Sequence, residues 1–237
     1  MADETLPSKR SVDAAAGALV AALLTPDPAR APEIEFDRSA FDGYADFVAK
    51  ANVVRHWRSA HAEPLRLVGA NLRHYAAPIA GARVSQRLKK FGTIIDKLVR
   101  FEGMRLSRME DIGGCRIVVP NEADAVAVAR RLRKNWTIRR YRDYVVEPKI
   151  DGYRARHLVV VKRERFVEVQ IRTVLQDLWA NTVERDGRRI GVGLKFGEGD
   201  GEALEAYRLM SELMAADERG EIARNELEAF LRVLRRF

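Results

Sequence analysis

Three polar side chains of the segment 167–173 have the types and spacing that phosphate and metal chemistry need. Glu168, Gln170 and Arg172 alternate strictly with apolar residues. Alternation is the period of a half-buried strand, so the three side chains are expected to share the face opposite the core. A carboxylate, an amide and a guanidinium in one row could hold a phosphate group and a metal ion. The same row is typical of an ordinary solvated strand face, and the pattern alone leaves both interpretations open.

Basic residues form a second candidate group. Lys89, Thr93 and Lys97 are four residues apart, which predicts that they stack on one face of a helix spanning 82–101. Stacked lysines repel one another unless an anion lies between them. A triphosphate would fit there, with the planar fork of Arg87 beside it. The alternative is a solvated basic helix face.

Asp111 stands at the entrance to the apolar run 112–119, which predicts a buried strand. The two glycines that follow, Gly113 and Gly114, let a backbone or a ligand approach closely. Two carboxylates plus substrate phosphates are the usual ligands of Mg²⁺, so Asp111 and Glu168 together could hold that ion. The alternative is that Asp111 is a turn residue that starts the strand.

A third candidate group surrounds Tyr153, which follows the Asp151-Gly152 turn signal. A tyrosine ring at that place could offer a flat face to a base. Lys149, Arg154 and His157 would surround it with positive charge and hydrogen-bond donors. A tyrosine after Asp-Gly is otherwise an ordinary hairpin residue.

A sheet must position these residues, and the pattern along the chain predicts the α+β class, with a mixed sheet of about five strands flanked by helices. Strands are expected at 112–119, 136–146, 155–163 and 166–172, and helices at 13–24, 41–74 with a break near 61–64, 82–101, 122–133, 173–183, 202–216 and 220–237. The segment 185–201 has six glycines and predicts a loop or flap. The expected organisation is an N-terminal tail and helices over 1–80 that pack on the core, a core over 81–200, and C-terminal helices over 201–237.

Composition limits the classes of function. The chain of 237 residues has a net charge of +8, and basic proteins usually have phosphate-bearing partners. The single cysteine, Cys115, excludes an internal disulfide and a CxxC zinc site, and is expected in the core. No apolar run reaches the length of a membrane span, and acidic residues near the apolar segment 14–24 argue against a signal peptide. A cytoplasmic protein without a membrane partner is expected.

In order and spacing, these groups resemble the synthetase domain of the RelA/SpoT family, which makes the alarmones ppGpp and pppGpp. The resemblance covers about residues 82–184. It rests on four motifs, which read Arg87-x-Lys89 with Thr93-Ile94 and Lys97, Asp111-Ile112-Gly113-Gly114-Cys115-Arg116-Ile117, Arg142-Asp143-Tyr144 with Pro148-Lys149-Ile150-Asp151-Gly152-Tyr153 and His157, and Glu168-Val169-Gln170-Ile171-Arg172-Thr173.

The resemblance implies a pyrophosphokinase that transfers the β,γ-pyrophosphate of ATP to the 3′-hydroxyl of GDP or GTP, with Mg²⁺ as cofactor. It implies that the metal ligands are Asp111 and Glu168, with Glu168 also the base on the 3′-hydroxyl. The implied ATP-binding residues are Arg87, Lys89, Thr93, Lys97 and Arg116. The implied acceptor residues are Tyr153, which stacks on guanine in the family, with Lys149, Asp151, His157, Gln170, Arg172 and Arg142.

Two departures from the family pattern concern the hydrolase domain and the acceptor. No His-Asp dipeptide occurs, so a small synthetase without the family's hydrolase domain is expected. Asp151 replaces the common asparagine, and its carboxylate could accept from guanine or merely suit the turn. The alternatives are a toxin-type enzyme acting on the 3′ end of tRNA or on an adenosine nucleotide, and a non-catalytic nucleotide- or nucleic-acid-binding module. A homo-oligomer and a neutralising antitoxin are partners that the resemblance allows.

Overall fold

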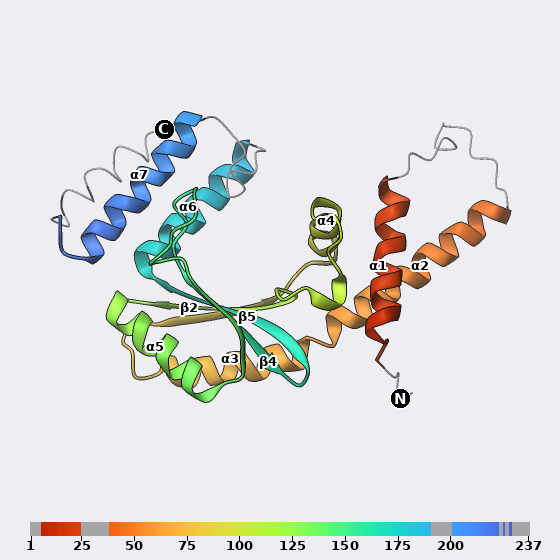
Figure 1. The fold of residues 1–237 in the computed structure, drawn as a ribbon, viewed down its shortest axis with the longest axis horizontal. Helices are drawn as coiled ribbons and strands as arrows, with labels where there is room; N and C mark the ends of the chain where they lie inside the picture. The colour runs from red at the N-terminus through yellow and green to blue at the C-terminus, as the bar shows by residue number, and fades with distance from the viewer. Residues whose placement is uncertain (1–5, 25–37, 191–200, 223–224, 226–227, 229–237) are drawn as a thin grey trace. The chain divides into compact units, whose positions relative to one another are not determined.

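The computed structural model describes residues 6–24, 38–190, 201–222, 225 and 228. Its helices and strands follow one another as shown in Figure 1. In chain order they are α1 (Lys9–Leu24), α2 (Arg38–Ser59), α3 (Ala62–Ala76), β1 (Arg83–Leu88), α4 (Phe91–Arg100), the 3-10 turn η1 (Leu106–Arg108), β2 (Gly113–Val119), α5 (Glu122–Asn135), β3 (Ile138–Asp143), β4 (Arg156–Lys162), β5 (Arg165–Thr173), α6 (Val174–Ile190) and α7 (Gly201–Glu218). None of the helices in the described ranges is both long and apolar enough to cross a lipid bilayer.

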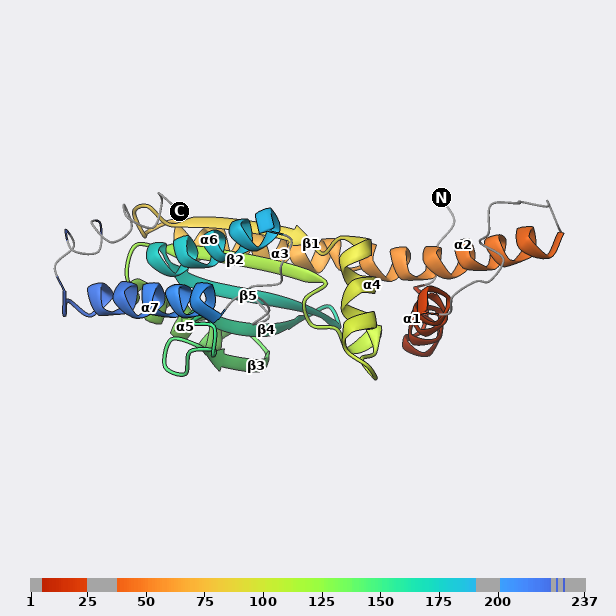
Figure 2. The ribbon, with the colours of Figure 1, turned by 90° about the horizontal axis from the view of Figure 1, so that it is seen from above.

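The strands form one sheet in the order β1-β2-β5-β4-β3, so β1 and β3 are its edges (Figure 2). β3 runs antiparallel to β4, with Arg142 opposite His157. Helix α5 lies on one face of the sheet and helices α6 and α7 on the other (Figure 1). The predicted α+β class, a five-stranded sheet flanked by helices, is confirmed.

The chain divides into two compact units, each with its own core. The first comprises the described parts of 1–68, 86–114 and 162–168, and the second those of 69–85, 115–161 and 169–237. Helices α1, α2 and α4 supply most of a core cluster in the first unit. Helices α6 and α7 pack on one another in the second unit through a cluster that includes Trp179 and Met214. Cys115 is buried in the second unit, as expected, and burial raises the pKa of its thiol to about 12.

The alternation predicted for 167–173 is confirmed in β5. Val167, Val169 and Ile171 are fully buried, as one face of a strand against a core must be. The polar face of β5 is not exposed to solvent along its whole length, because its last polar side chain, Arg172, is only 5% exposed. A guanidinium buried to that extent needs hydrogen-bond partners, and these partners define the site described below.

The helix expected over 82–101 is wrong for its first part. Residues 83–88 form the edge strand β1, and α4 begins only at Phe91. The long polar side chains of this segment have high helix propensity and no glycine or proline interrupts them, but pairing with the sheet prevails over propensity. The backbone N–H of Lys89 continues this pairing by donating to the carbonyl of Ile112 at 2.8 Å. Lys89 is therefore not on the same helix as Thr93 and Lys97.

The other predicted elements hold with shifted ends. The predicted break near 61–64 separates α2 from α3. Helix α6 is longer than expected and continues through Gly187 to Ile190, so the first part of the expected loop 185–201 is helical. Residues 191–200 and most of the expected helix 220–237 lie outside the described residues.

The hairpin between β4 and β5 stores backbone strain that a substitution can release. Its two-residue turn, Arg163 and Glu164, has φ values of 46° and 59°, the left-handed geometry that glycine and asparagine adopt at least cost. We expect Glu164→Gly to raise the free energy of unfolding by about 1 kcal/mol in urea titrations. Glu164→Ala is the matched control, because it removes the same side chain but keeps a Cβ. The prediction is contradicted if alanine stabilises the chain as much as glycine does.

Candidate functional site

The first unit holds two lysines on one carboxylate, here called the Asp111 cluster. The ammonium groups of Lys89, after β1, and Lys97, in α4, each donate to Oδ2 of Asp111 at 2.9 Å. Asp111 itself comes directly before β2. The two lysines do not stack on one helix as predicted, because they and Asp111 come from three different segments. The anion that lies between the two ammonium groups is the carboxylate of Asp111.

The second oxygen of Asp111 has no such partner. Oδ1 is buried and accepts no hydrogen bond from the part of the chain that the structure describes. A buried carboxylate oxygen without a partner costs about 1–3 kcal/mol. The side chain as a whole is still 22% exposed, so a ligand can approach it. A hard cation with oxygen ligands, such as Mg²⁺, fits this oxygen.

The other residues predicted on the ATP side of the first unit are Arg87, Thr93 and Glu168. Arg87 is exposed on β1, and Thr93 is exposed on α4. Glu168 is half-buried on β5, in the same unit as Asp111. These side chains therefore belong to the unit that carries the Asp111 cluster.

The second unit holds an aromatic and basic group, here called the Tyr153 cluster: Tyr144, Tyr153, His157 and Arg172. Arg172 Nη2 donates to the Tyr153 hydroxyl at 3.0 Å, and that hydroxyl lies 2.6 Å from His157 Nε2. A guanidinium can only donate, so the hydroxyl accepts from Arg172, and which atom donates in its bond with His157 Nε2 depends on the tautomer of the imidazole. The ring of His157 contacts those of Tyr144 and Tyr153 edge to face, with centroids 5.2 and 5.6 Å apart.

The sequence analysis missed Asp177, a carboxylate that binds two arginines of this unit. Its Oδ1 accepts from Arg116 at 3.0 Å and from Arg172 at 3.1 Å. Its Oδ2 accepts from Asn181, four residues further along α6, at 3.0 Å. Arg116, which the resemblance places at ATP, thus shares its anchor with Arg172, which it places at the acceptor. The signal available in the sequence was a lone carboxylate in the apolar run that follows β5.

Arg172 also anchors Gln170, whose amide oxygen accepts from Arg172 Nη2 at 3.0 Å. Lys149 is exposed, and its ammonium lies 5.0 and 4.9 Å from the ring centroids of Tyr144 and Tyr153. Both predicted acceptor residues therefore contact the Tyr153 cluster. Arg142 is exposed at the β3 edge, opposite His157 in the register of the two strands.

Asp151 has a backbone role in this loop. Its Oδ1 accepts from the backbone N–H of Tyr153 at 3.0 Å, which is an Asx turn. Gly152 has a φ of +87°, and a Cβ there would lie 3.0 Å from Ser211 Cβ and 3.1 Å from Arg208 Cα. Only glycine suits this position, and the loop that presents Tyr153 is therefore shaped by its own turn and by contact with α7.

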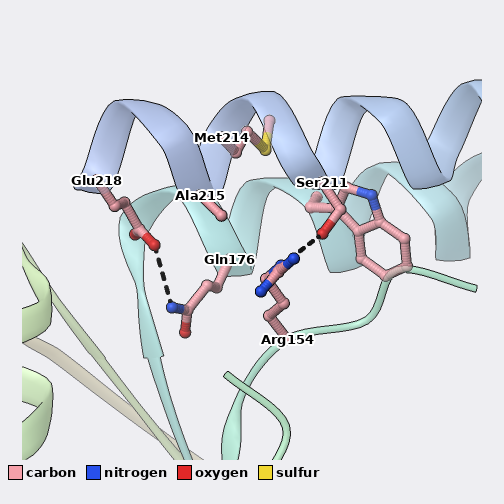
Figure 3. A pocket seen from close by; sticks show the side chains of 7 residues that line it. Arg154, Gln176, Ser211, Met214, Ala215 and Glu218 are labelled. Atoms are coloured by element: carbon pink, nitrogen blue, oxygen red, sulfur yellow. Dashed lines mark hydrogen bonds between the residues drawn. The ribbon is translucent and has the colours of Figure 1, made fainter. Parts of the chain in front are cut away.

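Helix α7 holds the same loop beside a small pocket lined by both polar and apolar side chains (Figure 3). The Ser211 hydroxyl donates to the carbonyl of Gly152 and accepts from Arg154 Nε at 3.1 Å. Gln176 Nε2 donates to Glu218 Oε2 at 3.2 Å. Burial raises the pKa of the Glu218 carboxyl, although bonds from Thr173 and Gln176 oppose that rise. The pocket is lined by groups that bond one another, so it serves to dock α7.

Residues 86–186 match a protein family described as the region found in RelA / SpoT proteins. All the predicted site residues, from Arg87 to Arg172, lie within that range. The chain is 33% identical over 127 residues to GTP pyrophosphokinase YwaC of Bacillus subtilis, covering 47% of this chain and 59% of that protein. It is 35% identical over 113 residues to GTP pyrophosphokinase YjbM of the same species, covering 43% and 53%. The chain thus spans little more than half the length of these relatives.

The fold is similar to that of small alarmone synthetase 1 of Bacillus subtilis, solved with its product pppGpp. The TM-score is 0.58 at 23% identity, and the alignment covers 71% of this chain and 98% of that chain. The similarity extends beyond the residues that match the family. It confirms the expected fold, a five-stranded sheet flanked by helices with further helices at both ends.

We expect Asp177→Asn to lower the free energy of unfolding by about 2 kcal/mol or more, because it leaves two largely buried guanidinium groups without their shared anion. Urea titration measures this loss. Asn181→Ala is the matched control, since it removes a neutral partner of the same carboxylate and should cost about 1 kcal/mol or less. Equal losses in the two variants would show that Asp177 is not the anchor.

Proposed function

We propose that this chain, whose residues 86–186 match the family described as the region found in RelA / SpoT proteins, transfers the β,γ-pyrophosphate of ATP to the 3′-hydroxyl of GDP or GTP. The observation that carries this proposal is that the matched range contains both the Asp111 cluster and the Tyr153 cluster in full. Relatives named GTP pyrophosphokinase support the choice of acceptor. In the reaction the 3′-oxygen bonds to the β-phosphorus, the bond from that phosphorus to the α–β bridging oxygen breaks, and AMP leaves.

The first unit supplies the groups that suit the ATP side. Transfer of this kind needs charge neutralisation and alignment more than covalent chemistry. Asp111 holds the ammonium groups of Lys89 and Lys97 close together, which is the arrangement of positive charge that a triphosphate needs. Arg87 is exposed two residues before Lys89, and its guanidinium can donate two parallel hydrogen bonds to phosphate oxygens. Glu168 is proposed as the base that takes the proton of the 3′-hydroxyl.

Mg²⁺ is proposed as the cofactor, with Oδ1 of Asp111 and the carboxylate of Glu168 as its protein ligands. No group of three or more His, Cys, Asp or Glu side chains in the described ranges could hold a metal ion. Mg²⁺ usually binds one or two carboxylates and completes its shell with substrate phosphates and water. When bound, the ion would neutralise charge on the transferring phosphates.

The second unit supplies the groups that suit the acceptor. The faces of Tyr144 and Tyr153 that attract the Lys149 ammonium can also receive a flat base. Lys149 would move aside and place its charge near the phosphates of the acceptor. One oxygen of Asp151 is used by the Asx turn, and the other can still accept from a base, so this residue does not decide the acceptor. The 3′ end of tRNA and adenosine nucleotides therefore belong in the acceptor test.

The test is an acceptor screen with ATP labelled in its γ-phosphate, Mg²⁺, and GDP, GTP, ADP or deacylated tRNA. We expect label to move to GDP and GTP. Glu168→Gln and Asp111→Asn should each lower kcat by about 100-fold or more, because the first removes the base and the second a metal ligand. Glu164→Gln and Asp96→Asn are matched controls, since they make the same changes at exposed positions of the same unit.

The outcomes separate the parts of the proposal. Label that moves only to tRNA or to ADP contradicts the acceptor and leaves the transfer reaction standing. Label that moves to no acceptor contradicts the activity. Transfer that survives Glu168→Gln and Asp111→Asn at the rate of the controls contradicts the roles of these two carboxylates.

A further inference from the structure

Most of the net charge of the chain is concentrated in one short segment. Residues 130–142 contain seven basic residues and no acidic one, which is a charge of +7 against +8 for the whole chain. The segment runs from the end of α5 to the end of the edge strand β3, within the second unit. We call its basic residues the β3 rim: Arg130, Arg131, Arg133, Lys134, Arg139, Arg140 and Arg142.

The rim is exposed and partly ordered by aromatic rings. All seven side chains are exposed. The guanidinium of Arg131 lies 4.0 Å from the ring centroid of Tyr75, and that of Arg133 lies 4.8 Å from that of Tyr141. A guanidinium stacked on a ring keeps the N–H groups at its edge directed to solvent and has already lost part of its conformational entropy. Such a group is prepared for a planar, bidentate contact with phosphate.

Ordinary structural roles account for only part of this charge. Arg133 and Lys134 in the last turn of α5 complement the negative end of the helix dipole. Charges on an edge strand such as β3 also discourage pairing with another chain. Neither role calls for a charge of +7 within 130–142. A positive surface of this density attracts a polyanion that spans the whole rim.

The rim leads to the Tyr153 cluster. Arg142 pairs with His157 across β3 and β4, and directly opposite residues of an antiparallel pair share one face of the sheet. Arg140, two residues earlier, projects to the same face. Helix α5, which carries the other end of the rim, lies on the face of the sheet opposite α6 and α7 (Figure 1). His157 in turn contacts Tyr153. The rim is therefore a basic path around the sheet edge that ends at the proposed acceptor site.

We propose that the β3 rim binds the phosphate backbone of a nucleic acid. Within 130–142, all of which the structure describes, no apolar side chain is exposed. A protein partner would need an apolar centre in its interface, and a membrane surface would need apolar groups to insert. Arginine forks on an exposed edge suit repeated phosphates instead. Arg142 is shared with the predicted acceptor residues, and the other six residues of the rim are not part of the site proposed above.

The test measures binding of the full chain to a labelled RNA of about 20 nucleotides and to DNA of the same sequence, by fluorescence anisotropy over about 50–200 mM KCl. The rim variant carries Arg130→Gln, Lys134→Gln and Arg140→Gln, which spares the two stacked arginines and Arg142. We expect it to bind at least about tenfold more weakly, with a salt slope smaller by about two to three, because three phosphate contacts are lost.

The matched control carries Arg66→Gln, Arg105→Gln and Arg108→Gln, three exposed positions of the first unit. It makes the same change in net charge and should lose little affinity. Equal losses in the two variants, or no binding of wild type to either RNA or DNA at low salt, overturn the proposal. If the rim variant binds both RNA and DNA more weakly, the result supports binding of the phosphate backbone. If it binds only RNA more weakly, the result supports the proposal and shows that the rim also distinguishes ribose from deoxyribose. Transfer to GDP, measured in parallel, should be the same in the rim variant and in wild type.

Discussion

A carboxylate shared by two cations is the interaction on which each cluster depends. Asp111 holds Lys89 and Lys97 on one oxygen, and Asp177 holds Arg116 and Arg172 on one oxygen. A protein that binds polyphosphate must keep several cations close together before the ligand arrives, and these cations repel one another. An internal carboxylate offsets the repulsion between the cations and fixes them in place. In the second unit the anchored Arg172 in turn donates a hydrogen bond to the Tyr153 hydroxyl and so positions that ring.

The sequence predicted the elements whose pattern is local. Strict alternation identified β5, and the apolar run after Asp111 identified β2. The segment 83–88 was predicted as the first part of a helix over 82–101, whereas it pairs with β2, whose residues lie about thirty positions further along the chain. The lysines predicted to stack on that helix still converge, but through Asp111. Chemical type was therefore easier to predict than the geometry that brings the side chains together.

Contacts made by α7 could not be read from the sequence at all. Ser211 lies far along the chain from the loop around Gly152, and nothing in either segment indicates that they meet. Asp177 was overlooked for a similar reason, because its partners lie on two different strands. The β3 rim is visible as a run of charge, but its continuity with Tyr153 follows only from the register of Arg142 with His157.

The central claim is that Asp111 gives one oxygen to two lysines and keeps the other for a metal ion that accompanies ATP. Calorimetry with a non-transferable ATP analogue, with and without Mg²⁺, tests it directly. Wild type should bind the magnesium complex at least about tenfold more tightly than the free analogue. Asp111→Asn should lose that preference, while Asp96→Asn keeps it. A preference for the magnesium complex that persists undiminished in Asp111→Asn would contradict the account.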